Sequence, residues 1–448
     1  MLGVYSKITS SAGQASLEFN YSHKAIVTMN TESLLAQYGP RESMEYDVVV
    51  VGGGMAGATA AKYIRTWSQG QINVTLIEKD ASYTSNIMSN EVLTGKRASI
   101  SSLAYSYTNL VNKYGVVRVQ GTVTTVDAIN KTVTYTGPSG SSVLTYDRLV
   151  MAPGLDFDLM PGMSGLSEYD TLVPHAWKAG AQTTLLRTQL LAIPNGQDVV
   201  ITIPLAPYRC PPGPYERACV IADWLRVYKP ASKVILLDAN STIQAQATNF
   251  QNAFNGLYGY KVDYRAGVTI TNLQLIAGAN VVSYTQAGLG KTVTAAVLNP
   301  IPPQRAPEVL VNAGLVSGKF APVNLLTYES TLVPGVHVIG DACISGMPKA
   351  GHIGNQEAKV CANGIIYALL GTSYAVNEAS PVLNSACFTP VNSTMASWLS
   401  AVYQYSGGAM TPSTANGVTQ PRASNGASRG NYKDMEKWFA TLMGDSFS

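Results

Sequence analysis

The chain has 448 residues, of which 46% are apolar and 13% charged, and its formal net charge is +3 at pH 7. This length allows two or three domains with a sizeable core. Because the net charge is small and no basic, aromatic-interleaved patch is present, we predict no nucleic-acid partner. No apolar run reaches the ~18 residues of a membrane-spanning helix, so we predict no transmembrane segment. The cysteines are too widely spaced for a CxxC zinc site or a disulfide framework, so no metal site is predicted. They are Cys210, Cys219, Cys343, Cys361 and Cys387.

Residues 1–43 precede the first strongly patterned segment. They are polar and aperiodic, and they lack the charged n-region and apolar h-region of a secretory signal, so no signal peptide is readable. We therefore predict an N-terminal extension over residues 1–43. It is either native or a leader placed ahead of the first domain.

A dinucleotide-binding motif begins at Tyr46. The β-branched run Tyr46–Val51 is typical of a buried parallel strand, and a GxGxxG sequence follows it at residues 52–57. Ala58–Trp67 is typical of a helix, and a second strand over 72–77 ends at an acid. In such a unit the glycines form the tight turn, admit the pyrophosphate and let the helix pack on the strand, while the acid binds ribose. The residues predicted for these roles are Gly52, Gly54, Gly57 and Glu78.

Further cofactor contacts are predicted in the segments that follow. A polar loop with a short helix, residues 83–96, is placed over the cofactor, and residues 117–135 are typical of strands, with alternation over 122–126. The strand and turn at 147–154 return the chain to the first domain. The contacts predicted here are Lys79, Val123 and Gly154.

A second α/β unit follows in which the glycines are missing. Strands at Val199–Ile203 and Val234–Leu237 flank a helix at Glu216–Val227, and Asp238 ends the second strand as an acid does in a nucleotide fold. The turn before the helix is rich in proline and contains Cys210. Prolines remove N–H donors, whereas a pyrophosphate cradle needs free N–H groups. We therefore predict that a thiol has replaced the second nucleotide site.

A strand that ends in Gly-Asp completes the first nucleotide site. It follows further strands within 262–300 and a rigid loop at 301–306, and it lies at 335–342. In flavoenzymes this Asp holds the ribitol, and the next helix aims its N-terminus at the flavin ring. The two motifs together predict FAD rather than NAD. The helix is predicted at Gln356–Leu370, and the predicted contacts are Gly340, Asp341, Lys349 and Gly351.

The last region begins after Gly371 and contains Cys387. Residues 406–430 are rich in Gly, Ser, Thr and Asn and are typical of a flexible loop. Residues 432–445 show the spacing of an amphipathic helix. We favour docking of this helix on the protein's own core, and the alternative is a peripheral contact with a membrane surface or a partner.

Several of these segments together resemble the flavoprotein subunit of flavocytochrome c sulfide dehydrogenase, a branch of the sulfide:quinone oxidoreductase group. The resemblance covers about residues 46–448 and implies an α/β fold of the glutathione-reductase type, with two Rossmann-like dinucleotide-binding domains and a C-terminal α+β interface domain. The implied domains are FAD-binding (44–155 and 301–371), degenerate NAD-like (156–300) and interface (372–448). The matching stretches are SNEVLTG (89–95), PHAWKAG (174–180), RCPPGPYERA (209–218), IPPQRA (301–306), GVHVIGDA (335–342) and MPKAG (347–351).

The same resemblance implies the chemistry. In the family two cysteines form a redox-active disulfide beside the flavin, and the matching positions are Cys210 and Cys387; the family's candidate acid/base falls on Glu216. The family also implies sulfide as substrate, a cytochrome c subunit as acceptor and a periplasmic location. Its best-known members attach the flavin covalently to a cysteine at the position of Asn86, and no cysteine lies between residues 58 and 209. We therefore expect non-covalent FAD, with Asn86 beside it.

A cysteine pair suits sulfide oxidation because hydrosulfide attacks a disulfide to give a persulfide and a free thiolate. The thiolate can pass two electrons to FAD, which can release them singly to haem. We assign Cys387 to the flavin side and Cys210 to the persulfide. Glu216 is either a proton carrier whose pKa is raised by burial or a carboxylate that stabilises a helix N-terminus.

Other interpretations stay open at this point. The chain could be a sulfide:quinone oxidoreductase or a catalytically silent flavin-binding scaffold for a partner, whereas the missing second fingerprint disfavours an NAD(P)H-dependent disulfide reductase. Cys343 is the rival redox partner of Cys210. The remaining residues considered are expected to be structural, namely Cys219, Cys361, His175 and His352.

Overall fold

The structure is a computed structural model that describes residues 6–11, 14–19, 46–372, 380–414 and 420–448. The chain forms two compact units, residues 1–45 and 46–448. In the first unit, β1 (Ser6–Ser11) and β2 (Gln14–Phe19) form an antiparallel pair, so the predicted extension contains paired strands that its aperiodic sequence did not indicate. The second unit contains all other described elements.

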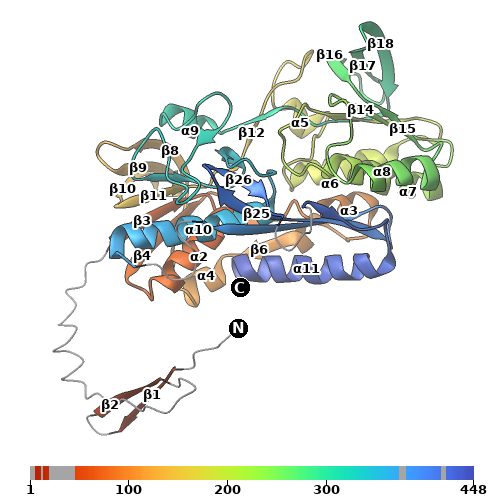
Figure 1. Ribbon diagram of the computed structural model, residues 1–448. Coiled ribbons are helices and arrows are strands. Elements are labelled where there is room, and N and C mark those ends of the chain that lie inside the picture. The colour runs from red at the N-terminus through yellow and green to blue at the C-terminus, as the bar shows by residue number, and fades with distance from the viewer. Residues whose placement is uncertain (1–5, 12–13, 20–45, 373–379, 415–419) are drawn as a thin grey trace. The chain divides into compact units, whose positions relative to one another are not determined.

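A five-stranded parallel sheet, in the order β22-β11-β3-β4-β7, forms the first α/β half of residues 46–448 (Figure 1). Its central strand β3 (Tyr46–Val51) is buried over its last four residues, as expected for a β-branched run with neighbours on both sides. Helix α2 (Met55–Trp67) follows directly and packs against α10 (Gly351–Leu370). The other strands of the sheet are β4 (Ile72–Glu78), β7 (Val117–Gln120), β11 (Arg148–Met151) and β22 (Val336–Val338).

Shorter elements connect the strands of this half. An antiparallel sheet, in the order β10-β9-β8, extends from it, and small two-stranded pairs join β5 to β6, β12 to β20 and β21 to β23. These elements are β5 (Ser82–Thr84), α3 (Ser89–Thr94), the 3-10 helix η1 (Ile100–Leu103), β6 (Ala104–Ser106), α4 (Thr108–Asn112), β8 (Thr122–Asp127), β9 (Thr132–Gly137), β10 (Gly140–Thr145), β12 (Asp156–Phe157), β20 (Gln304–Arg305), α9 (Glu308–Asn312), β21 (Ala321–Pro322), the 3-10 turn η3 (Gly340–Ala342) and β23 (Cys343–Ile344).

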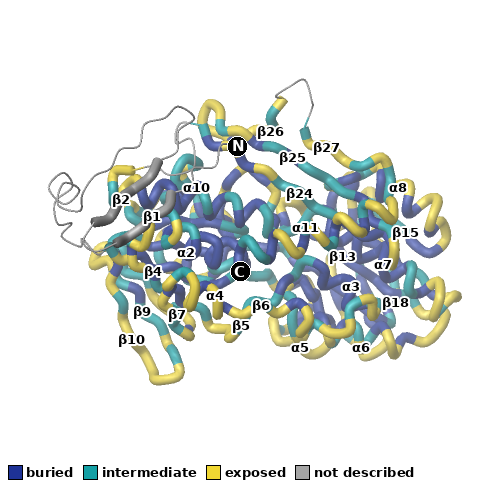
Figure 2. The backbone as a smooth tube through the Cα atoms, turned by 90° about the horizontal axis from the view of Figure 1, so that it is seen from below, coloured by how far each residue is buried: buried dark blue, intermediate teal, exposed yellow. Residues whose placement is uncertain are grey.

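The second α/β half contains a four-stranded parallel sheet in the order β15-β14-β13-β19. Strands β13 (Val199–Ile203) and β14 (Val234–Asp238) are buried at every position, and α7 (Gly213–Tyr228) connects them. Figure 2 shows buried residues concentrated in the two parallel sheets and their covering helices, while the β9–β10 hairpin is mostly exposed. The remaining elements are α5 (Glu168–Thr171), α6 (Ala181–Ala192), α8 (Ala247–Asn252), the π-helix η2 (Ala253–Leu257), β15 (Val262–Arg265), the antiparallel strands β16 (Val268–Gln274), β17 (Asn280–Gln286) and β18 (Leu289–Ala295), and β19 (Val297–Pro300).

The C-terminal region forms an antiparallel sheet that contacts both halves. Strand β24 (Val382–Pro390) contacts α10 of the first half and α7 of the second, and it pairs with β25 (Ala396–Ser406). The predicted flexible stretch 406–430 instead contains β26 (Ala409–Pro412) and β27 (Arg422–Ala423), which both pair with β25.

Helix α11 (Arg429–Phe447) settles the role of the amphipathic segment. Its apolar side chains are buried and belong to the same core as β3 and α2, so the helix docks on the protein's own core as we favoured. The alternative of a membrane contact through 432–445 is wrong for this apolar face, because the face is already covered. The buried side chains of α11 include Tyr432, Met435, Phe439, Leu442, Met443 and Phe447.

The start of helix α10 differs from the prediction. The helix begins at Gly351, five positions before the predicted start at Gln356, which brings its first turn into the site described below.

Among the described residues, no helix combines the length and apolarity that crossing a membrane requires. The three domain boundaries within residues 46–448 stay a prediction, because these residues form one compact unit.

Candidate active site

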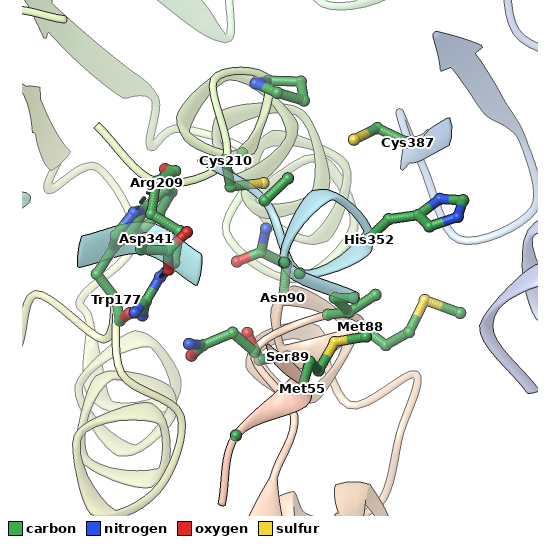
Figure 3. Close-up of a pocket in the computed structure, with 18 of the residues that line it drawn as sticks. Met55, Met88, Ser89, Asn90, Trp177, Arg209, Cys210, Asp341, His352 and Cys387 are labelled. Atoms are coloured by element: carbon green, nitrogen blue, oxygen red, sulfur yellow. Dashed lines mark hydrogen bonds and ion pairs between the residues drawn. The ribbon is translucent and has the colours of Figure 1, made fainter. Parts of the chain in front are cut away.

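A pocket lies where the first half, the second half and the C-terminal sheet meet. It encloses about 1300 Å³ of space that atoms do not fill, including its open mouth. Figure 3 shows Cys210 and Cys387 on its wall with their sulfur atoms directed toward one another. The predicted site residues that line the pocket are Gly54, Asn86, Gly154, Cys210, Glu216, Gly340, Asp341, Gly351 and Cys387.

The glycine loop of the first half has the geometry that a dinucleotide requires. A Cβ on Gly52, whose φ is +96°, would lie 2.3 Å from the Ala152 carbonyl oxygen, and a Cβ on Gly57 would lie 1.9 Å from the Gly52 carbonyl oxygen. These two glycines therefore permit the turn and the helix packing. Gly54 differs, because a Cβ there would meet no atom within 4 Å. The empty space beside Gly54 faces the pocket, where a pyrophosphate would approach.

Other predicted contacts lie outside the pocket wall. Glu78 accepts hydrogen bonds from the Gly53 and Asp80 backbone N–H groups, at 2.6 and 2.8 Å, which places its carboxylate at the glycine loop. Lys349 donates from Nζ to the carbonyl oxygens of Asp341 and Cys343. Six of the predicted contacts do not line the pocket, and their ligand roles stay predictions. They are Gly52, Gly57, Glu78, Lys79, Val123 and Lys349.

The proline-rich turn is attached to the first half at three points. The Cys210 N–H donates to the Lys349 carbonyl oxygen at 2.7 Å, and the Arg209 N–H donates to Gln304 Oε1 at 2.8 Å. Arg209 Nε also forms an ion pair with Asp341 Oδ2 at 2.5 Å (Figure 3). The loop that holds the thiol is therefore fixed to the Gly-Asp motif predicted for the flavin.

Three non-glycine residues of the pocket wall have left-handed backbone conformations. They are Met88, Ala176 and Cys210, with φ of +70°, +47° and +58°. Such conformations cost roughly 1–3 kcal/mol each and concentrate at functional sites, where surrounding contacts hold them. Cys210 combines this conformation with a thiol on the pocket wall.

The two pocket thiols lie close to one acid, Glu216. Burial raises the pKa of Cys210 well above its ordinary value, and the nearby Cys387 and Glu216 raise it further; burial likewise raises the pKa of Cys387 to about 12. Both cysteines are free thiols in this structure and are partly accessible. In the reduced state at neutral pH both therefore hold their protons.

Glu216 lies at the start of α7, close enough to both thiols to influence their pKa. Its side chain is buried, and its Oε1 accepts a hydrogen bond from Asn90 Nδ2 at 2.8 Å. Burial raises the pKa of Glu216 to about 8. A carboxyl group with this pKa can give and take protons near neutral pH, so the proton-carrier interpretation has physical support, while the assignment stays a prediction.

The other cysteines and histidines differ in whether they line the pocket. Cys343 lies outside the pocket wall and contacts the buried Glu357, while Cys219 and Cys361 are buried within helices as expected. His175 is buried, and burial lowers its pKa to about 3. His352 lines the pocket, and its Nδ1 accepts the Ala386 N–H beside Cys387.

The acid that ends the second strand of the second α/β half has internal hydrogen-bond partners. Asp238, at the end of β14, is fully buried and accepts hydrogen bonds from the Tyr215 and Tyr264 hydroxyls at 2.7 and 3.0 Å. Asn240 donates to the same carboxylate. The acid that would meet a ribose is therefore committed to internal partners, which agrees with the missing fingerprint.

The residues present fit FAD. Beside the open space at Gly54 lies a buried Asn86 Oδ1, which has no hydrogen-bond partner among the residues that the structure describes. The first turn of α10 also contributes, since Gly351 and His352 line the pocket. This 20-residue helix presents its N-terminus there, and the positive end of its dipole favours negative charge on a flavin ring. Among the described residues no group of three or more His, Cys, Asp and Glu gathers to hold a metal.

Comparison with known families agrees with this site. The model of the central region of the flavocytochrome c sulfide dehydrogenase flavoprotein chain matches residues 183–302, and the flavin-binding model of the same family matches residues 379–447. A pyridine nucleotide-disulphide oxidoreductase model matches residues 46–201. The resemblance to the flavocytochrome c sulfide dehydrogenase flavoprotein chain is confirmed. The chain is a flavin oxidoreductase, and FAD is its cofactor.

Solved structures show the same fold in distant relatives. The sulfide:quinone oxidoreductase from Aquifex aeolicus is 18% identical, with a TM-score of 0.72 over 90% of this chain and 91% of that chain. An NAD-dependent persulfide reductase from A. fulgidus is 16% identical, with a TM-score of 0.59 over 79% and 64%. These likenesses establish the α/β fold of the pyridine nucleotide-disulfide oxidoreductase type that the sequence predicted.

Proposed function

We propose that this chain oxidises sulfide with a Cys210–Cys387 pair and passes the electrons through non-covalent FAD to a cytochrome c subunit, in the periplasm. The observation that carries the proposal is that these two cysteines, from segments far apart in the sequence, lie in one pocket with Gly54, Asp341 and the start of α10. The proposed oxidised state of the pair is a disulfide.

The chain's own groups account for the first half of the reaction. Hydrosulfide attacks Cys210 Sγ, the Cys210–Cys387 bond breaks, and the electron pair remains on Cys387 as a thiolate. Cys210 then bears the sulfide sulfur as a persulfide. Glu216, with a pKa of about 8, holds a proton at neutral pH and can move it to either sulfur. Bound FAD supplies two-electron acceptance from a thiolate and one-electron release to a haem partner.

The test is an anaerobic titration with sulfide that follows the visible flavin absorbance. The proposal expects loss of absorbance in wild type and in Cys343→Ser, and an oxidised flavin in Cys210→Ser and Cys387→Ser. Cys361→Ser, buried in α10 and outside the pocket wall, is the matched control. If sulfide leaves the wild-type flavin oxidised, the proposal fails and a silent scaffold becomes the better interpretation.

Two additional assays complete the proposal. Precipitation of the protein with acid should release all of its FAD, because no cysteine is available at the position of Asn86. Turnover with sulfide should reduce cytochrome c faster than a short-chain quinone. A preference for quinone would instead identify the chain as a sulfide:quinone oxidoreductase.

A further inference from the structure

Arg217 is a buried cation that forms no ion pair with any carboxylate in the described part of the chain. It lines the pocket but is only 2% exposed. Its guanidinium donates four hydrogen bonds, and all four acceptors are uncharged oxygens. These are the carbonyl oxygens of His175 and Ala176 and the side-chain oxygens of Asn90 and Asn299, at 2.8–2.9 Å. A buried charge is usually compensated, so this arrangement calls for an anion that the pocket receives from outside.

The titratable groups around Arg217 do not supply that anion at neutral pH. On its own helix, Glu216 keeps its proton because burial raises its pKa to about 8, and in the neighbouring loop His175 is neutral. From α3, Glu91 is already paired with Arg97. Cys210 and, from β24, Cys387 hold their protons in the reduced state.

Arg209, the other arginine of the pocket, forms an ion pair with Asp341, so this pair adds no net charge, although Arg209 does lower the pKa of Cys210. The reduced pocket therefore has a net positive charge located on Arg217. Burial lowers the pKa of this guanidinium to about 9, which still leaves it charged at neutral pH.

Trp177 connects the charge of Arg217 to the sulfur of Cys210. The guanidinium of Arg217 stacks over the Trp177 ring at 4.6 Å. A Cβ placed on Gly213 would lie 2.9 Å from both Cys210 Sγ and a carbon of the same indole ring, so sulfur and ring pack on one glycine. In addition, negative charge on Cys210 raises the pKa of Arg217. Sulfur, indole and guanidinium are consecutive neighbours in the pocket wall.

We infer that the positive charge of Arg217 stabilises the anionic sulfur in this pocket, first as hydrosulfide and then as the persulfide on Cys210, and so selects small monoanionic sulfur nucleophiles. The inference rests on the proposed function, because it assigns the anion to the sulfur chemistry of Cys210. Neutral oxygens orient the guanidinium without cancelling its charge, which a carboxylate partner would do. Arg217 therefore determines specificity for anionic sulfur, in addition to connecting neighbouring segments by hydrogen bonds.

The test measures the rate of Cys210 alkylation by iodoacetamide in the reduced full-length protein across a range of pH, with the modified peptide identified by mass. Arg217→Gln should lower the rate about tenfold at a given pH, which corresponds to a pKa one unit higher. Arg217→Lys, which keeps the charge and loses the planar fork, should stay within about threefold of wild type. Arg226→Gln removes an exposed, Asp223-paired arginine from the same helix and should change nothing. A wild-type profile in Arg217→Gln, or equal loss in Arg217→Lys, overturns the inference.

A second measurement serves if Arg217→Gln does not fold. Azide, a small monoanion, should protect wild-type Cys210 from alkylation more than chloride does at the same ionic strength, and Arg217→Lys should retain this protection. Absence of protection in wild type overturns the inference. Neither measurement uses sulfide, so the two proposals can fail separately. If sulfide leaves the wild-type flavin oxidised but Cys210 alkylation still depends on Arg217, the proposed function is disproved and the anion site is supported.

Discussion

The two α/β halves share the order of four parallel strands, β11-β3-β4-β7 in the first and β19-β13-β14-β15 in the second, and differ in how the first strand leads into its helix. In the first, three glycines, residues 52–54, connect β3 to α2, whereas nine residues, 204–212, connect β13 to α7. Glu78 ends its strand and accepts the N–H of the glycine loop, while Asp238 ends the equivalent strand and accepts tyrosine hydroxyls. The short glycine turn leaves space for a cofactor, and the long proline-rich turn projects a thiol toward it.

This difference teaches that one parallel-sheet architecture can carry either a glycine turn or a thiol after its first strand. The sheet of the second half remains buried because its aliphatic strands need cover on both faces. The halves differ in the connection after the first strand and in the partners of the strand-terminal acid. The second half supports Cys210, Glu216 and Arg217, all of which line the shared pocket.

The largest expected effect comes from Gly57→Ala in the first half. Its Cβ would lie 1.9 Å from the Gly52 carbonyl oxygen, so either the turn or the helix must move. We expect loss of bound FAD and a free energy of unfolding of the apoprotein lowered by roughly 1–3 kcal/mol. Flavin content after purification and urea denaturation of the apoprotein measure the two effects.

Gly54→Ala is the matched variant, because its Cβ meets no protein atom within 4 Å. It should lower FAD affinity about tenfold to a hundredfold by filling the cradle, while the apoprotein unfolds at the wild-type urea concentration. Equal destabilisation by both variants would contradict the assignment of Gly54 to the cofactor.

Glu216→Gln tests the acid at the start of α7. Below pH 8 the native carboxyl is protonated and can act as a proton donor, and above pH 8 it is ionised. The wild-type rate of flavin reduction by sulfide should therefore fall above pH 8, and the variant should be slower by about a hundredfold and lack this fall.

Stability provides an independent measure of the same pKa. The unfolded carboxyl ionises near its ordinary pKa of 4.5, whereas the native one keeps its proton to about 8. The contribution of Glu216 to stability is therefore complete below pH 4.5 and is lost as the pH rises through 8. Wild type should lose more stability than Glu216→Gln between pH 5 and 8. Parallel stability curves would show that the native pKa is not raised.

The sequence predicted most of the first half because its signals are local. Strand, glycines, helix and terminal acid follow one another between residues 46 and 78, and each has a distinct residue pattern. The start of α10 was missed because Gly351 and Gly354 are poor helix formers. The structure explains them by packing, since a Cβ on either would press against Met55 or Ala56 of α2.

The parts of the site that sequence reasoning missed depend on contacts between distant segments. Arg209 pairs with Asp341, Asn90 bonds both Glu216 and Arg217, and Trp177 stacks on Arg217. Two arginines flanking the cysteine turn were a visible signal, but a sequence does not reveal whether an arginine meets a carboxylate or only neutral oxygens. The left-handed backbone of Cys210 had no signal at all, because such conformations are imposed by tertiary contacts.

The smallest expected effects come from variants that compare Glu78 and Asp238, the two acids that end equivalent strands. Tyr215→Phe removes one of the hydroxyls that Asp238 accepts, so it should lower the free energy of unfolding by about 1–2 kcal/mol. Tyr260→Phe, on a 77% exposed tyrosine, is the control and should have no effect. Glu78→Gln should act mainly on the cofactor, with weaker FAD binding and an apoprotein destabilised by at most about 1 kcal/mol, because a glutamine oxygen still accepts the Gly53 N–H and only the exposed Asp80 N–H loses its acceptor. The opposite result would be unchanged stability in Tyr215→Phe together with reduction of the flavin by NADH. In that case the tyrosines only cover a nucleotide site that can still bind NADH, and Asp238 is not committed to internal partners.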